Sequence, residues 1–74
     1  MRNIVGPRIR QLRRRARPPV TQTDLAARLQ SAGVDIDQTA ISKIEADKRL
    51  VSDIEVAAIA KALGLKPGDL FEGP

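Results

Sequence analysis

Two segments of the chain open with the same signal for starting an α-helix. Residues 21–24 read TQTD and residues 52–55 read SDIE, so in each a hydroxyl side chain stands three positions before an acid. At this spacing the two side chains satisfy the free N–H groups of a first helical turn. Gly33 and Gly64 follow the two segments, and a glycine there supplies the left-handed residue that ends a helix. The pattern therefore predicts two short helices and favours a helical fold.

Three further segments fit the same fold. Residues 7–17 carry an aliphatic stripe at helical spacing and are followed by two prolines, which end a helix. The third helix along the chain is expected over residues 38–46, capped by Asp37. Residues 67–71 are expected to form a last turn whose Leu70 and Phe71 cover the core. Because no segment alternates with a period of two, the predicted fold class is all-α.

The composition excludes several kinds of site. The 74 residues contain neither Cys nor His, and one Phe is the only aromatic residue. Disulfides, thiolate or imidazole metal sites and histidine catalysis are therefore excluded, so we expect no enzyme activity and no cofactor. The sequence shows no signal-peptide pattern and no apolar run long enough to span a bilayer. We expect a single domain over residues 1–74, a cytoplasmic location and no membrane partner.

Positive charge is concentrated at one end of the sequence. Residues 1–23 contain seven Arg and no acid, whereas the remainder has six basic residues against nine acidic ones. A polyanion-binding surface has this asymmetry, although an Arg-rich helix can also serve solubility alone.

The outward side of the helix predicted over residues 38–46 is short, polar and poor in acid. It carries Gln38, Thr39, Ser42 and Lys43, with Ala46 at its end. Gln pairs with adenine, Thr contacts thymine, and Lys reaches guanine acceptors or phosphate. The small residues let such a helix sink into a major groove, so we interpret this side as a base-reading surface.

Four stretches of the chain together resemble a known family. They are IRQLRRRA (9–16), VTQTDLAARL (20–29), TAISKIEADKR (39–49) and SDIEVAAIAKALGLKPGDLF (52–71). In this combination the sequence resembles the lambda-repressor and Cro-like, or Xre-type, helix-turn-helix family. The resemblance implies a compact five-helix lambda-repressor-like DNA-binding domain, with the helix-turn-helix at helices 2 and 3.

The resemblance also implies roles for single residues. Those expected to read bases are Gln38, Thr39, Ser42 and Lys43. Those expected to contact DNA phosphates are Gln22, Arg10, Lys48 and Arg49. Arg13 matches the family's arginine that pairs with the glutamate at position 45, and Glu45 is the one acid inside the reading helix. Pairing with Arg would neutralise that acid, so we expect a structural ion pair.

The sequence departs from the family pattern in the connection between helices 2 and 3. QSAGVDID makes it longer by about five residues than the usual form. Either the second helix runs a further turn or the loop bulges. Asp47 also stands where family members often have glycine.

These features favour a sequence-specific transcriptional regulator, expected to be a repressor that binds a two-fold symmetric operator in double-stranded DNA as a homodimer. The last helix and residues 70–74 are the expected self-association surface, and a regulatory protein partner is a further possibility. The alternative is a protein-interaction module, such as an antitoxin-like partner, with the same fold and weak or no DNA binding. A membrane-surface role ranks lower, because the Arg-rich helix has no aromatic anchor.

Overall fold

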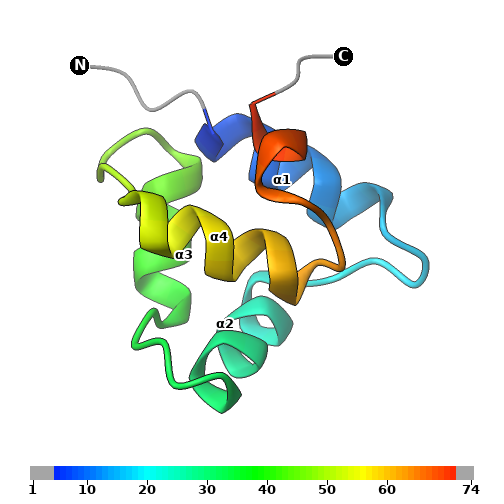
Figure 1. Ribbon diagram of the computed structural model, residues 1–74, viewed down its shortest axis with the longest axis horizontal. Helices are drawn as coiled ribbons and strands as arrows, with labels where there is room; N and C mark the ends of the chain where they lie inside the picture. The colour runs from blue at the N-terminus through cyan, green and yellow to red at the C-terminus, as the bar shows by residue number, and fades with distance from the viewer. Residues whose placement is uncertain (1–4, 72–74) are drawn as a thin grey trace.

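The computed structural model describes residues 5–71. The elements are α1 (Val5–Arg15), α2 (Gln22–Ser31), α3 (Gln38–Glu45), α4 (Asp53–Ala62) and the 3-10 turn η1 (Pro67–Leu70), as Figure 1 shows. No β-strand occurs within residues 5–71, which agrees with the predicted all-α class. The five-helix count is not confirmed, because this part of the chain forms four α-helices and one 3-10 turn. None of these helices is both long and apolar enough to cross a membrane.

The predicted starts of α2, α3 and α4 are confirmed, whereas α1 begins at Val5 and not at Pro7. In α2 the hydroxyl of Thr21 accepts the N–H of Asp24, whose carboxylate accepts the N–H of Thr21 in return. Ser52 and Glu55 make the same reciprocal pair at α4. The carboxylate of Asp37 caps α3 by accepting an N–H from its first turn at 2.8 Å. Side chains next to the helices in sequence thus set where three of them begin.

The helices α2, α3 and α4 all end in the same way. Each is followed by a residue with a positive φ angle: Gly33 at 81°, Asp47 at 61° and Gly64 at 73°. The next N–H then bonds to a carbonyl in the last helical turn. These bonds are Val34 to Leu29, Lys48 to Lys43 and Leu65 to Ala60, at 2.9, 2.8 and 2.8 Å. Because only two of the three left-handed positions are glycine, Asp47 carries a conformational cost that the other two avoid.

The core is aliphatic throughout, and α3 packs against both α1 and α2 while α4 packs against α2 and η1. Its fully buried large side chains are Ile9, Leu25, Leu29, Ile36, Ile41, Ile44, Ile59 and Leu70. The expectation that Phe71 joins Leu70 over the core is wrong. Leu70 is buried, but η1 ends at that residue and the Phe71 side chain is 55% exposed.

The long connection between α2 and α3 is partly helix and partly loop. The helix α2 includes Gln30 and Ser31, the first two residues of QSAGVDID, and the other six lie between α2 and α3. The loop is anchored near its end by Ile36, which is 1% exposed. The Ile36 N–H bonds to the carbonyl of Val34 at 3.0 Å, which forms a tight turn before α3 begins. Ile36 therefore places the start of α3 through packing against the core.

Candidate nucleic-acid interface

A groove of about 460 Å³ lies between α1, the start of α2 and the outer side of α3. It is lined by polar and basic side chains, with one acid, Glu45, and a single alanine among them. The lining residues are Arg10, Arg13, Arg14, Thr21, Gln22, Thr23, Gln38, Ser42, Glu45 and Ala46. Three segments that are distant in sequence thus meet at one polar surface.

A buried ion pair closes the floor of this groove. Arg13 of α1 donates from Nε and Nη2 to the two carboxylate oxygens of Glu45, at 2.8 and 2.7 Å. The third donor, Nη1, bonds to the carbonyl of Val20 at 3.0 Å. The hydrogen bonds to Glu45 raise the pKa of Arg13. Because its two oxygens are held in this way, Glu45 is neutralised within the protein and presents little negative charge to the groove.

The two glutamines at the starts of α2 and α3 extend this pair to the surface. Gln22 donates from its amide nitrogen to Glu45 at 3.1 Å, and its amide oxygen accepts the amide N–H of Gln38 at 2.8 Å. Gln22 is half-buried and Gln38 is exposed. After these bonds Gln38 still has its amide oxygen and a second N–H available to an outside group. Its amide is therefore oriented by a chain of contacts that begins at Arg13.

The comparison with protein families decides the assignment of the fold. A model described as a helix-turn-helix domain matches residues 4–72. The chain belongs to the helix-turn-helix domain family. No curated protein and no solved structure matches it.

Membership of this family suggests DNA as the partner. The outer side of α3 carries the residues that the sequence predicts to contact it. Thr39, Ser42 and Lys43 are all exposed there, and Ser42 lines the groove. Within residues 5–71 none of these three side chains has a hydrogen-bond or ion-pair partner. They differ in this from Gln38, whose amide is partly engaged with Gln22. The predicted reading residues thus form one exposed surface with one member held in place.

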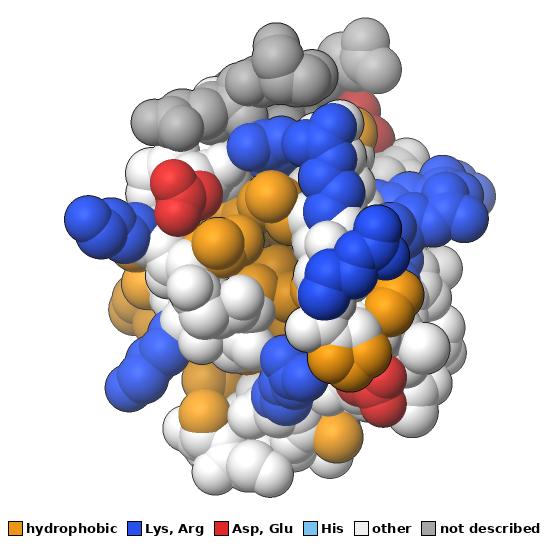
Figure 2. Space-filling view, turned by 90° about the vertical axis from the view of Figure 1, so that its right-hand side faces the viewer, with side chains coloured by type: hydrophobic (Ala, Val, Ile, Leu, Met, Phe, Trp, Pro, Cys, Tyr) orange, Lys and Arg blue, Asp and Glu red, His pale blue; other side chains and the backbone are white. Residues whose placement is uncertain are grey.

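Arginine side chains of α1 border the groove. Arg10 and Arg14 stand one helical turn apart, both are exposed, and neither has a polar partner within residues 5–71. Arg8, by contrast, is bonded to the carbonyl of Asp69 at 3.2 Å and to Gln11 at 2.7 Å. Figure 2 shows the right-hand side of Figure 1, where Lys and Arg side chains extend around a mainly apolar surface and acidic side chains are fewer. The chain therefore offers unpaired guanidinium groups at the edge of the groove.

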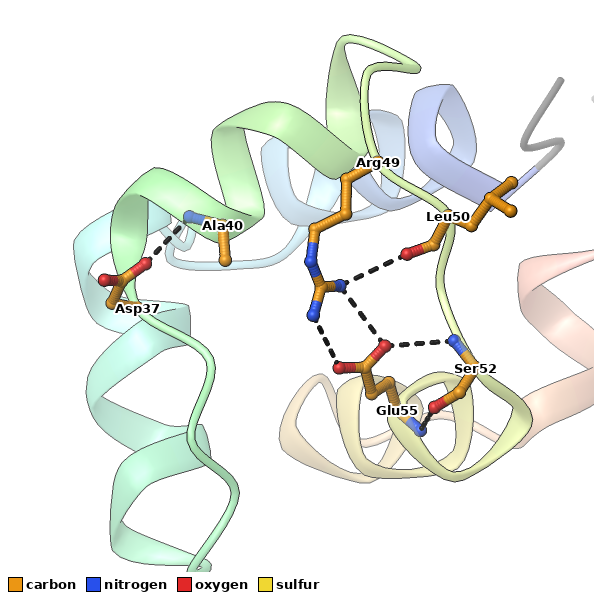
Figure 3. Close-up of polar contacts among 6 residues, drawn as sticks. All are labelled: Asp37, Ala40, Arg49, Leu50, Ser52 and Glu55. Carbon is orange, nitrogen blue, oxygen red and sulfur yellow. Dashed lines mark hydrogen bonds and ion pairs between the residues drawn. The ribbon is translucent and has the colours of Figure 1, made fainter. Parts of the chain in front are cut away.

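Lys48 and Arg49, both predicted to contact phosphates, have different surroundings. Lys48 is exposed in the turn after α3. Arg49 instead holds Glu55 of α4 through two hydrogen bonds of 3.2 and 2.9 Å, as Figure 3 shows. These bonds lower the pKa of Glu55 and raise that of Arg49. Arg49 is thus committed to an ion pair within the helix-turn-helix domain, which the sequence pattern did not indicate.

The groove also contains residues that the sequence interpretation did not select. Arg14, Thr21 and Thr23 line it beside the predicted residues. The spacing of Arg14 from Arg10 placed both on one side of a helix and was the available signal. The sequence held no such signal for Thr21 and Thr23. The capping role of Thr21 already explained that residue, and no sequence feature set Thr23 apart from other surface residues.

Proposed function

We propose that this single domain is a sequence-specific regulator of transcription of the lambda-repressor and Cro-like (Xre) type, and that it acts as a repressor in the cytoplasm. The helices α2 and α3 are its helix-turn-helix. The recognition helix α3 enters the major groove of double-stranded DNA with its exposed polar side facing the bases. Gln38, Thr39, Ser42 and Lys43 read base edges.

The observation that carries this proposal is the chain of contacts from Arg13 through Glu45 and Gln22 to Gln38. A glutamine reads adenine well only when its amide lies in a fixed plane, because both of its bonds to the base depend on that plane. The bond from Gln38 to Gln22 restricts this plane. A solvated surface glutamine would have no need of a support that ends in a buried ion pair.

The phosphate contacts surround this reading surface. Gln22 lies at the first turn of α2, where free backbone N–H groups favour an anion, and its second amide hydrogen remains available for a phosphate oxygen. Arg10, with Arg14 beside it, supplies unpaired charge from α1, and Lys48 supplies it after α3. Arg49 contributes mainly by holding the turn that carries Lys48, because its guanidinium is bonded to Glu55.

A homodimer on a two-fold symmetric operator completes the proposal. One recognition helix makes few base contacts, so useful specificity requires two half-sites about 34 Å apart, one turn of DNA. Repression then follows because the bound dimer occupies the operator. A regulatory protein partner would relieve repression by removing the dimer from the DNA.

Selection of bound sequences from random duplex DNA tests this function. We expect an enriched motif with two-fold symmetry, and binding that falls steeply with salt. Enrichment of no motif, together with binding that is weak at low salt, would overturn the proposal.

A protein-interaction module without DNA binding is the second candidate. Asp47 favours it, because this acid stands in the turn between α3 and Lys48, close to where phosphates would lie. The same salt titration separates the two candidates. An interaction module would show no salt-dependent affinity for duplex DNA.

A further inference from the structure

Two of the three large apolar side chains exposed within residues 5–71 stand near each other in the chain. Leu50, in the turn before α4, is 62% exposed, and Ile54, in the first turn of α4, is 77% exposed. The third, Phe71, follows η1. We refer to Leu50 and Ile54 as the entry patch. Exposed aliphatic side chains in a small protein indicate a contact surface when they occur together and not singly.

The backbone that carries the entry patch is held firmly. Arg49 bonds to both carboxylate oxygens of Glu55 and to the carbonyl of Leu50 at 3.3 Å. Glu55 also accepts the N–H of Ser52 at 3.0 Å. Figure 3 shows the Leu50 side chain directed away from this cluster. A patch on fixed backbone loses little conformational entropy when a partner covers it.

Charges on either side of the entry patch suit a second copy of the same chain. Lys48 precedes Leu50 in the chain, Asp53 lies between Leu50 and Ile54, and both charged side chains are exposed. A contact about a two-fold axis places each surface against itself, so a surface that carries both signs can pair each Lys48 with the Asp53 of the other copy. The surface thus contains both signs of charge that a self-complementary contact needs.

The place of the entry patch in the chain agrees with two copies on one DNA duplex. The recognition helix α3 ends at Glu45, shortly before Leu50. A two-fold contact at this point keeps the two copies of α3 on neighbouring half-sites, as a symmetric operator requires.

The patch is too small to hold a dimer together without DNA. Two aliphatic side chains from each copy bury far less than the roughly 1,200–2,000 Å² of a stable protein interface. When DNA holds both copies, however, the second contact becomes effectively intramolecular and a small patch is sufficient.

We infer that Leu50 and Ile54 form the contact between two copies of this chain on adjacent half-sites, and that the copies pair on DNA and not in free solution. The inference rests on the proposed function. It places self-association at the start of α4, away from residues 70–74, of which Leu70 is fully buried and 72–74 lie outside the described residues.

The test uses three duplexes built from the selected motif: one half-site, two half-sites in the selected spacing, and the same two half-sites moved apart by half a turn of DNA. We expect the wild-type chain to fill the correctly spaced pair cooperatively, by about 5- to 150-fold over independent binding. The half-turn shift should abolish cooperativity, because it rotates the second copy to another face of the duplex.

Ile54→Glu is the test variant, because an acid in the first turn of a helix favours the helix and Ile54 contributes little to the core. Leu50→Ser is the second variant. Ala27→Glu on the exposed side of α2 is the control, since it adds the same charge outside the patch. For the single half-site, Ile54→Glu should have the affinity of Ala27→Glu, and Leu50→Ser should have that of the wild type. Both patch variants should lose cooperative binding to the two half-sites, whereas Ala27→Glu should retain it.

Sedimentation of the free protein completes the test, and a monomer at micromolar concentration is expected. Cooperative binding that persists in both patch variants would overturn the inference while leaving the proposed function intact. A stable dimer in free solution would also overturn it. If the wild-type chain did not bind the single half-site specifically, that result would instead contradict the proposed function itself.

Discussion

Arg13 of α1 and Glu45 at the end of α3 share two parallel hydrogen bonds, at 2.8 and 2.7 Å, although 32 positions separate them in sequence. Their side chains are only 10% and 4% exposed. Loss of one partner would leave the other charge buried without a counterion, which costs far more than loss of an exposed pair. The pair therefore holds α3 against α1 and orients Gln22.

Replacing one partner of this pair should destabilise the fold. We expect Glu45→Ala to lower the free energy of unfolding by about 3–5 kcal/mol, because the Arg13 guanidinium remains buried. Urea unfolding followed by far-UV circular dichroism measures this, since the chain has no Trp or Tyr to report by fluorescence. Asp35→Ala, at an exposed acid, is the control and should stay within about 0.5 kcal/mol. A loss below about 1 kcal/mol in Glu45→Ala would show that the pair behaves like an exposed one.

Gln22 and Gln38 should be coupled in DNA recognition. We expect Gln38→Ala to lose about 1–3 kcal/mol of discrimination at one base position. Gln22→Ala should weaken discrimination at that same position, because it frees the Gln38 amide to rotate. A double-mutant cycle on the preferred and the substituted duplex measures the coupling. Additive effects of the two substitutions would mean that Gln22 contacts DNA without supporting Gln38. Lys43→Ala serves for comparison and should alter preference independently of Gln22.

Substitutions of Lys48 and Arg49 should affect different properties of the protein, DNA affinity alone for Lys48 and the stability of the fold as well for Arg49. Lys48→Ala removes one exposed charge and should weaken binding to all sequences, with the salt slope reduced by about 1. Its stability should be unchanged. Arg49→Ala should lower stability as well, since it releases Glu55. Binding titrations at several salt concentrations, beside urea unfolding of each variant, distinguish the two. An Arg49→Ala protein of wild-type stability would contradict the structural role given to this residue.

The sequence predicted the starts of α2, α3 and α4 and the all-α class because those depend on neighbours in the chain. Thr21, Ser52 and Asp37 cap residues within their own first turn, so local spacing is sufficient information. The position of α1 was less accurate. Pro7 suggested its first residue, whereas it begins at Val5, which the core buries.

The site could be predicted in part. The outward side of α3 followed from helical spacing. The partner of Arg49 did not, because Glu55 already had a complete role in the capping box and nothing in the sequence indicates a second one. The exposure of Phe71 was equally hidden, since a single turn can place either of two neighbouring apolar residues inward.

Asp47 should be replaceable by glycine with a gain in stability. Its φ angle of 61° lies in the left-handed region, where glycine has no steric cost. We expect Asp47→Gly to raise the free energy of unfolding by roughly 0.5–1 kcal/mol. Gly33→Ala is the reciprocal control, because its φ angle is 81° and an added Cβ would meet no atom within 4 Å. That substitution should destabilise through the backbone alone. If Asp47→Gly were destabilising, side-chain contacts of Asp47 would outweigh its backbone cost.

Acid should weaken the fold partly through Glu55. Hydrogen bonds from Arg49 hold the pKa of Glu55 below its ordinary value of 4.5. A group whose pKa is lowered by folding stabilises the protein above its unfolded pKa, and this contribution is lost as the pH falls through the folded value. We therefore expect stability to decrease below about pH 4.5, and less steeply in Glu55→Gln. Urea unfolding at pH 7 and at several acidic pH values tests this. Equal pH dependence in both proteins would exclude a contribution from Glu55.

The buried Ile36 gives the long α2–α3 connection an unexpected property. Because this side chain is inserted in the core just before α3, the loop itself fixes where α3 starts. Val34 packs against the same core and its backbone bonds to Leu29 and to Ile36, so insertions or deletions between Ala32 and Asp35 should displace the start of α3. The loop is thus a poor position for attaching a label or a fused peptide.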